Sequence, residues 1–150
     1  MNGEKLEKIH FIGIGGIGMS ALASYFISKK LKVSGYDKIL SPITENLKKE
    51  GATIFHNDEL TRIDNIEKID LVVYTPAIDD DNNQLKYFYK NNYNILKRSD
   101  VLGDISNLYR TIAVAGTHGK TTTSSIIAHI LKVSKKQGAC FIGGVTSNYE

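Results

Sequence analysis

The chain has 150 residues, enough for one well-buried core, or for one domain and the start of a second. Its formal net charge of only +3, carried by scattered lysines, excludes a basic surface of the kind that binds nucleic acid or a membrane. Residues 1–8 are polar and no apolar run approaches the ~20 residues of a membrane span, so we expect no signal peptide and a cytosolic (cytoplasmic) protein.

The first predicted strand leads directly into a glycine-rich loop. Residues 9–14 form an apolar run typical of a buried strand. The pattern G-x-G-x-x-G, completed by Gly13, Gly15 and Gly18, precedes an amphipathic helix. The next predicted strand ends at Asp37, about 20 residues further on, where a carboxylate can meet a ribose or a base. This arrangement predicts a site for a nucleotide diphosphate, although such glycines can also serve only to let a helix pack closely on a strand.

The chain up to residue 109 continues this alternation of strands and helices. Further strands are predicted at 31–36, 52–55, 69–74 and 93–96, and helices at 42–49, 83–90 and 99–109. The alternation predicts an α/β fold, a Rossmann-like parallel sheet with helices on both faces. Ligands of such sheets bind beyond the carboxyl ends of the strands. The residues predicted to meet there are Gly15, Asp37, His56, Thr75 and Arg98.

A second glycine-rich loop lies between a predicted strand, 111–115, and a predicted helix that starts at Lys120. Main-chain N–H groups and a positive helix end surround such a loop, so it predicts a polyphosphate site. Lys120 would reach the β- and γ-phosphates, and the Thr121 hydroxyl would coordinate Mg²⁺. Val114 stands where the strict P-loop pattern has a glycine, so the match is to a shorter loop, and an ordinary glycine-rich turn is the alternative.

The segment after this loop is predicted to be the beginning of a second domain. Its helix is predicted to bury an apolar stripe of Ile126, Ile127, Ile130 and Leu131. A strand is predicted over 139–142, with Cys140 as a buried thiol that has no partner for an internal disulfide. We therefore expect a Rossmann-like domain over 1–109, followed over 110–150 by the first βαβ unit of a P-loop ATP-binding domain.

With both loops in view, the sequence resembles the Mur ligases of bacterial cell-wall synthesis. The resemblance rests on IGIGGIGMS at 12–20, GYD at 35–37, VYTPAI at 73–78, AVAGTHGKTTT at 113–123 and IGG at 142–144. It covers nearly the whole chain from Ile9 onward, and the loop at 15–20 favours the alanine-adding branch over the branch that recycles murein tripeptide. The family often has Gly-Ser-Asp at 35–37, Gly-His at 55–56 and Ser-Ser-Ala-Ile at 75–78, and this chain departs from it at all three.

The resemblance implies that the first domain holds the UDP part of UDP-N-acetylmuramate. The residues that it implies in this site are Gly13, Gly15, Gly16, Ile17, Gly18, Asp37, His56, Thr75, Ala77 and Arg98. Of these, the loop 15–18 would lie against the diphosphate and Asp37 near the uridine. The remaining side chains would surround the same cleft.

The resemblance also implies an ATP site in the second domain, with Mg²⁺ as cofactor. Its residues would be Gly116, Thr117, His118, Gly119, Lys120, Thr121 and Thr122, with Lys120 and Thr121 catalytic and Thr121 a metal ligand. ATP would phosphorylate the muramyl carboxylate to an acyl phosphate, which the amine of L-alanine then attacks. A contact of His118 with a phosphate and a purely structural role are both open. Family members carry further domains, so we expect this chain alone to bind the UDP substrate without turnover.

Two other functions fit part of the sequence. An NAD-dependent oxidoreductase would use the first loop and Asp37 but gives no role to Lys120 and Thr121. A non-catalytic nucleotide-binding module would use both loops without chemistry. The sequence leaves the oligomeric state open.

Overall fold

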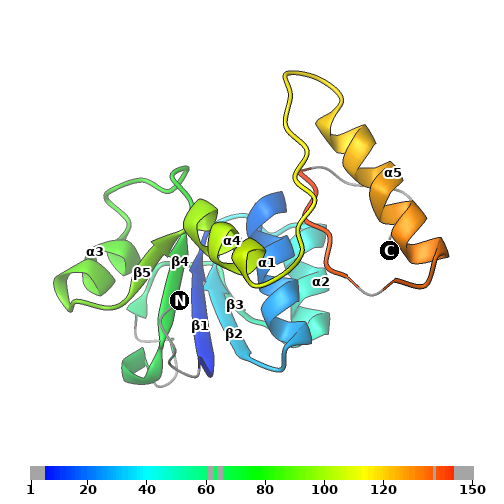
Figure 1. Ribbon diagram of the computed structural model, residues 1–150. Helices are drawn as coiled ribbons and strands as arrows, with labels where there is room; N and C mark the ends of the chain where they lie inside the picture. The colour runs from blue at the N-terminus through cyan, green and yellow to red at the C-terminus, as the bar shows by residue number, and fades with distance from the viewer. Residues whose placement is uncertain (1–5, 61–62, 64–65, 137, 144–150) are drawn as a thin grey trace.

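The computed structural model describes residues 6–60, 63, 66–136 and 138–143, and a parallel sheet forms its centre (Figure 1). The strands are β1 (Lys8–Ile12), β2 (Lys32–Tyr36), β3 (Thr53–Phe55), β4 (Leu71–Tyr74) and β5 (Ile95–Lys97). Their order across the sheet is β3-β2-β1-β4-β5, and every adjacent pair is parallel. The predicted Rossmann-like sheet is therefore confirmed, and β1 with its glycine-rich loop lies at the middle of it.

Helices cover both faces of the sheet, as predicted. The helices α1 (Ile17–Ser28), α2 (Pro42–Glu50) and α4 (Arg98–Asn107) pack on one face, and α3 (Asn83–Lys90) with the 3₁₀ helix η2 (Ile66–Lys68) on the other. Strand side chains alternate between these layers, so that Phe11 of β1 joins the core under α1 while Ile12 joins the core under α3. In the described part of the chain, no helix has both the length and the apolar character needed to cross a membrane.

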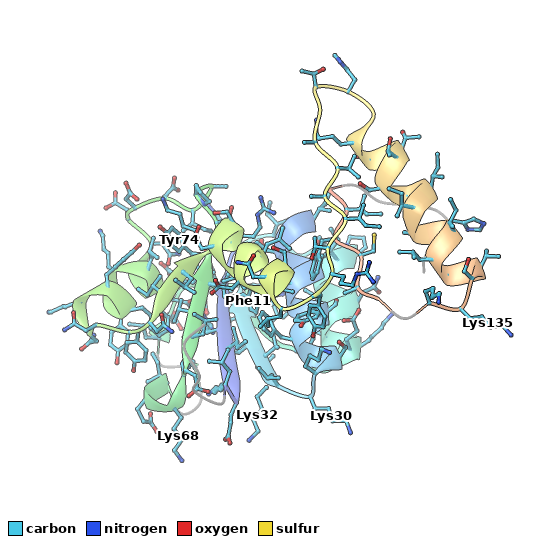
Figure 2. The ribbon with its side chains drawn as sticks, in the orientation of Figure 1. Phe11, Lys30, Lys32, Lys68, Tyr74 and Lys135 are labelled. Carbon is cyan, nitrogen blue, oxygen red and sulfur yellow. The ribbon has the colours of Figure 1, made fainter. Side chains whose placement is uncertain are left out.

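The two edges of the sheet carry different features. Figure 2 shows Lys32 and Lys68 at the edge where the strands begin and Tyr74 at the edge where they end. Because all the strands run in the same direction, the loop after β1, the turn after β4 and the start of α4 gather at the second edge. This is the edge at which parallel sheets bind ligands.

A polar cluster lies inside the core under α3. His10 of β1 is completely buried, with Nδ1 2.9 Å from the Ser34 hydroxyl and Nε2 2.9 Å from Oε1 of Gln84. An amide oxygen only accepts hydrogen bonds, so Nε2 carries the hydrogen and Nδ1 accepts from Ser34. Burial lowers the pKa of His10 from 6.5 to about 4, because the imidazolium would lose its hydration. His10 is therefore neutral at physiological pH.

The chain after residue 110 departs from the prediction. The helix α5 (Lys120–Val133) begins at the predicted residue, but the segments 111–115 and 139–142 form no strand. A strand needs a neighbour for its main-chain hydrogen bonds, and in the described residues neither segment has one. Figure 1 shows α5 standing away from the sheet at the end of an extended segment. The predicted burial of the α5 stripe is consequently wrong, since Ile126 is 55% exposed and Ile130 is 56% exposed.

Residues 138–143 lie beside α1. Phe141 packs against Tyr25 of α1, with 5.7 Å between the ring centroids. Neighbouring side chains of an extended segment point to opposite sides, so Phe141 takes the inward position and Cys140 the outward one. The thiol of Cys140 is exposed, and the prediction that it is buried was wrong. Gly144, which belongs to the last motif of the resemblance, lies outside the described residues.

Candidate nucleotide-binding sites

The loop between β1 and α1 is anchored at its start and exposed at its crest. Gly13 has a φ of 85°, a left-handed conformation that favours glycine. Its N–H donates to the Tyr36 carbonyl oxygen at 2.7 Å, and a Cβ added to it would lie 2.8 Å from Cγ2 of Thr75. Gly13 is buried under the turn that follows β4, whereas Gly16 and Ile17 are exposed. The crest of the loop is therefore open to a ligand.

The first turn of α1 offers N–H groups that the helix itself does not use. Gly16 is the N-cap, in an extended conformation, and no side chain among the described residues caps the helix there. The helical hydrogen bonds begin with the N–H groups of Met19 and Ser20, which both donate to the Gly16 carbonyl oxygen. The N–H groups of Ile17 and Gly18 precede these bonds at the positive end of the helix dipole. Such a terminus attracts an anion.

Arg98 brings a positive charge to the same helix start. It is the first residue of α4, directly after β5, and its side chain is half-buried. A Cβ added to Gly18 would lie 2.7 Å from Nη1 of Arg98, so the guanidinium rests directly on the glycine. A guanidinium beside free main-chain N–H groups is suited to bind a phosphate group.

Asp37, at the end of β2, is bonded to the loop. Its Oδ2 accepts a hydrogen bond from the N–H of Gly15 at 2.7 Å, and its Oδ1 accepts one from the N–H of Ile39 at 2.9 Å. The predicted convergence of Gly15 and Asp37 is therefore present in the structure. The carboxylate, however, is engaged with the protein main chain at both oxygens.

His56, directly after β3, lies beside Asp37. Its Nδ1 donates to the main-chain oxygen of Asp37 at 2.9 Å, and Nζ of Lys48 lies 3.2 Å from its Nε2. A lysine ammonium only donates, so Nε2 is the acceptor in this contact. Lys48 also pairs with Glu45 at 2.9 Å. Both ring nitrogens of His56 are thus hydrogen-bonded within the protein. A contact of His56 with a nucleotide would therefore be made by the face of its ring.

The turn after β4 completes this edge of the sheet. The N–H of Ile78 donates to the Thr75 carbonyl oxygen at 3.1 Å, which closes the turn over Gly13. Thr75 is half-buried and Ala77 is exposed. Seven predicted residues thus lie along one edge: Gly13, Gly15, Gly18, Asp37, His56, Thr75 and Arg98.

The structure adds residues that the sequence did not single out. Thr44 is fully buried, and its Cγ2 would lie 3.0 Å from a Cβ on Gly15. The signal was available, because Ser41 and Thr44 have the spacing of a capping box and form one at the start of α2. Lys48 gave no such signal, since its contact with His56 depends on how α2 lies beside β3.

The second loop is fully exposed and folds around its own lysine. Gly119 has a φ of 76° and is the N-cap of α5. Nζ of Lys120 donates to the carbonyl oxygens of Gly116 and Thr117. His118 and Thr121 are exposed. The lysine ammonium therefore lies over the loop, where a phosphate group could replace the two carbonyl oxygens as its partner.

The hollows on the described surface include one small and one shallow one, and neither is a complete nucleotide pocket. A cavity of about 60 Å³ lies beside Gly18 and Arg98, with Phe141 and Gly143 on its other side. A shallow hollow of about 450 Å³ lies between α3 and the chain around Asp58, and none of the predicted site residues lines it. The small cavity is lined mostly by apolar side chains, those of Ala21, Leu22, Leu102, Phe141 and Ile142. We place the candidate site at Gly18 because Arg98 lies against the start of α1 there.

The sequence matches the family model described as "Mur ligase family, catalytic domain" over residues 8–110. The chain belongs to the Mur ligase family. The matched range contains the whole parallel sheet and every residue of the first candidate site in this Mur ligase chain.

Curated relatives of this Mur ligase chain support the assignment. A UDP-N-acetylmuramate–L-alanine ligase of Porphyromonas gingivalis is 47% identical over 97% of this chain and 32% of its own length. A UDP-N-acetylmuramate–L-alanine ligase of Parabacteroides distasonis is 48% identical over 100% of this chain and 33% of its own length. The chain thus spans about a third of the length of these relatives.

Solved structures of the family have the same fold. The UDP-N-acetylmuramate–alanine ligase of Thermotoga maritima matches with a TM-score of 0.85 and 36% identity, over 95% of this chain and 33% of its own. A UDP-N-acetylmuramate:L-alanyl-γ-D-glutamyl-meso-diaminopimelate ligase of Neisseria meningitides has the same TM-score of 0.85 but 27% identity, over 97% of this chain and 45% of its own. Backbone geometry therefore does not separate the two kinds of ligase, and the sequence identity is higher to the alanine ligase.

Proposed function

We propose that this chain carries the UDP-binding and ATP-binding loops of a ligase that joins L-alanine to the carboxylate of UDP-N-acetylmuramate through an acyl phosphate. The proposal is supported by the names of the curated relatives and by the higher identity to the alanine ligase structure, 36% against 27%. The observation that carries the binding step is Arg98 resting on Gly18 at the open terminus of α1.

The first site would bind the diphosphate of the nucleotide sugar. The N–H groups of Ile17 and Gly18 and the guanidinium of Arg98 supply hydrogen bonds and positive charge. His56 would present its ring, and the turn of Thr75 to Ala77 would border the nucleotide. This assigns UDP recognition to residues 1–109.

The second site would bind ATP, over residues 116–122. Lys120 would leave the carbonyl oxygens of Gly116 and Thr117 and contact the transferred phosphate, where it offsets negative charge. Thr121, which is exposed at the start of α5, would hold Mg²⁺ through its hydroxyl. The magnesium ion would neutralise charge on the phosphates. We assign this loop to a second domain that begins near residue 110.

Calorimetry tests the proposal directly. Purified chain titrated with UDP-N-acetylmuramate is expected to bind it, and UDP is expected to compete for the same site. NADH, followed by its fluorescence, is expected not to bind. Tight NADH binding without detectable UDP binding at millimolar ligand would contradict the proposal and favour an oxidoreductase.

Turnover is a separate measurement. Because the chain spans about a third of its relatives, we expect no phosphate release when it is mixed with ATP, UDP-N-acetylmuramate and L-alanine. ATP-dependent amide formation by the purified chain would show that this expectation is wrong while leaving the substrate assignment intact.

A further inference from the structure

We propose that Asp37 is a positioning residue, whose carboxylate holds the glycine-rich loop in its binding shape and does not bind the ribose of the nucleotide. The proposal rests on the proposed function, because it concerns the same UDP site. It differs from the usual expectation for an acidic residue after the second strand of such folds, which is a contact with the ribose hydroxyls.

Both oxygens of the carboxylate are already used by main-chain donors. Oδ2 lies 2.7 Å from the nitrogen of Gly15, a short distance for an N–H group and typical of a charged acceptor. Oδ1 lies 2.9 Å from the nitrogen of Ile39. One side chain thus fixes the loop after β1 and the turn after β2 relative to each other.

The main chain of Asp37 is fixed as well. Its N–H donates to the Phe55 carbonyl oxygen at 3.0 Å, and its own carbonyl oxygen accepts from Nδ1 of His56 at 2.9 Å. Asp37 therefore connects the ends of β2 and β3 to the loop after β1. A side chain held at this many points has little freedom to turn toward a ligand.

The loop is packed around this contact. A Cβ added to Gly15 would lie 2.8 Å from Oδ2 of Asp37 and 3.0 Å from Cγ2 of Thr44. Thr44 is itself fixed, because it is fully buried and its Oγ1 accepts from the N–H of Ser41 at 3.0 Å. Gly15 is thus clamped between two fixed side chains, which places the next residues at the start of α1.

Charge supports the same division of roles. A carboxylate that faced the bound diphosphate would repel it, since like charges in contact are unfavourable. Because Oδ2 accepts from the Gly15 N–H, the carboxylate is turned toward the loop and away from the ligand. The phosphates can then bind the N–H groups of Ile17 and Gly18 and the guanidinium of Arg98. Asp37 then contributes to binding indirectly, by holding the loop in an ordered conformation.

The test compares Asp37→Asn with wild type on three ligands: UDP, 2′-deoxy-UDP and inorganic diphosphate. The variant side chain has the same shape but only one accepting oxygen, so one of its two main-chain donors loses its partner. We expect the affinity for all three ligands to fall by the same factor, about tenfold, which corresponds to the loss of one hydrogen bond to a charged group. Asp79→Asn, which removes the same charge from an exposed loop, is expected to leave all three affinities unchanged.

A ribose contact would give a different pattern. The variant would then lose affinity for UDP but not for inorganic diphosphate, and the wild-type preference for UDP over 2′-deoxy-UDP would disappear. That result would overturn the positioning role while leaving the UDP site in place. Failure of wild type to bind UDP would instead contradict the proposed function.

Hydrogen exchange of the Gly15 amide, followed by NMR, needs no ligand, and wild type alone already tests the proposal. The amide is expected to be protected in wild type, because Asp37 accepts its hydrogen. Asp37→Asn is expected to exchange faster at Gly15, and Asp79→Asn is not. A wild-type Gly15 amide that exchanges at the rate of an open loop would overturn the proposal, even if Asp37→Asn does not fold.

Discussion

Arg98 lies against Gly18 so closely that a Cβ on the glycine would be 2.7 Å from Nη1 of the guanidinium. Arg98 is the first residue of α4 and Gly18 lies in the first turn of α1, and the order of the strands brings the two helix starts together. A helix terminus and a cation reinforce each other at one point of the carboxyl edge. This pair supports our proposal that the loop is an anion site rather than only a tight turn.

We therefore expect Arg98→Gln to weaken the binding of UDP-N-acetylmuramate by about 10- to 100-fold, the usual effect of losing a hydrogen bond to a charged group. Calorimetry measures the change. The matched control is Arg110→Gln, because Arg110 is exposed and has no assigned role in the site. Equal losses in both variants would show that only net charge matters, and the site assignment would be wrong.

The glycine that starts the loop is expected to matter for stability. Gly13→Ala would place a methyl group 2.8 Å from Cγ2 of Thr75 in a residue with φ of 85°. We expect the free energy of unfolding to fall by about 1–3 kcal/mol, because both the contact and the backbone conformation are unfavourable for alanine. Thermal or urea unfolding measures the change.

Gly103→Ala is the control for that variant. Gly103 lies in α4 with nothing within 4 Å of an added Cβ, so alanine is expected to stabilise the protein there by up to about 1 kcal/mol. Opposite signs for the two substitutions are the expected result. A stabilising Gly13→Ala would show that the loop does not hold the conformation described above.

The sequence predicted the Rossmann-like sheet well because each of its elements carries a local signal. The apolar run before Gly13, the capping residue Ser41 and the C-cap glycine Gly51 each mark a boundary that the structure confirms to within a few residues. Those signals depend on neighbours along the chain. They can therefore be read from the sequence without knowledge of the tertiary fold.

The predictions that failed concern segments whose structure depends on partners distant in the sequence. The residues 111–115 and 139–142 have strand-like composition, but a strand exists only beside another strand. Likewise Ile126 and Ile130 have the spacing of a buried stripe, and burial requires a second surface to cover it. Periodicity reports which side of a segment is apolar and says nothing about what lies opposite.

In the first site, the sequence predicted which residues meet but not what they do there. Asp37 was expected near the uridine, and the structure shows its carboxylate bonded to Gly15 and Ile39. The spacing between a loop and an acidic residue places a side chain at the edge of the sheet. Which atoms of that side chain are already engaged depends on the folded structure.

The two loops are expected to bind independently. Among the described residues, the hydrogen bonds of the Lys120 ammonium go to its own loop, at Gly116 and Thr117, and Figure 1 shows that loop away from the sheet. Lys120→Met should therefore weaken ATP binding while changing the affinity for UDP by no more than about twofold, as for distant sites with no shared partner. Lys136→Met is the control, since Lys136 is exposed beyond α5. A large loss of UDP affinity in Lys120→Met would show that the two loops form one site.

The buried His10 is expected to make stability depend on pH. Its pKa falls from 6.5 to about 4 in the folded protein, so above pH 6.5 both folded and unfolded forms are neutral there and His10 has no effect. As the pH drops from 6.5 toward 4, only the unfolded chain takes up the proton, and the free energy of unfolding falls by up to about 3 kcal/mol.

Urea unfolding between pH 7 and 5 measures this loss, and that window lies above the reference pKa values of Asp and Glu, about 3.9 and 4.3. His10→Gln is expected to remove most of the slope, whereas His129→Gln, at an exposed position of α5, is expected to keep it. The NMR titration of the His10 ring provides a check that does not depend on the variant. A ring that titrates near pH 6.5 in the folded protein would contradict both its burial and its neutral hydrogen bonds to Ser34 and Gln84.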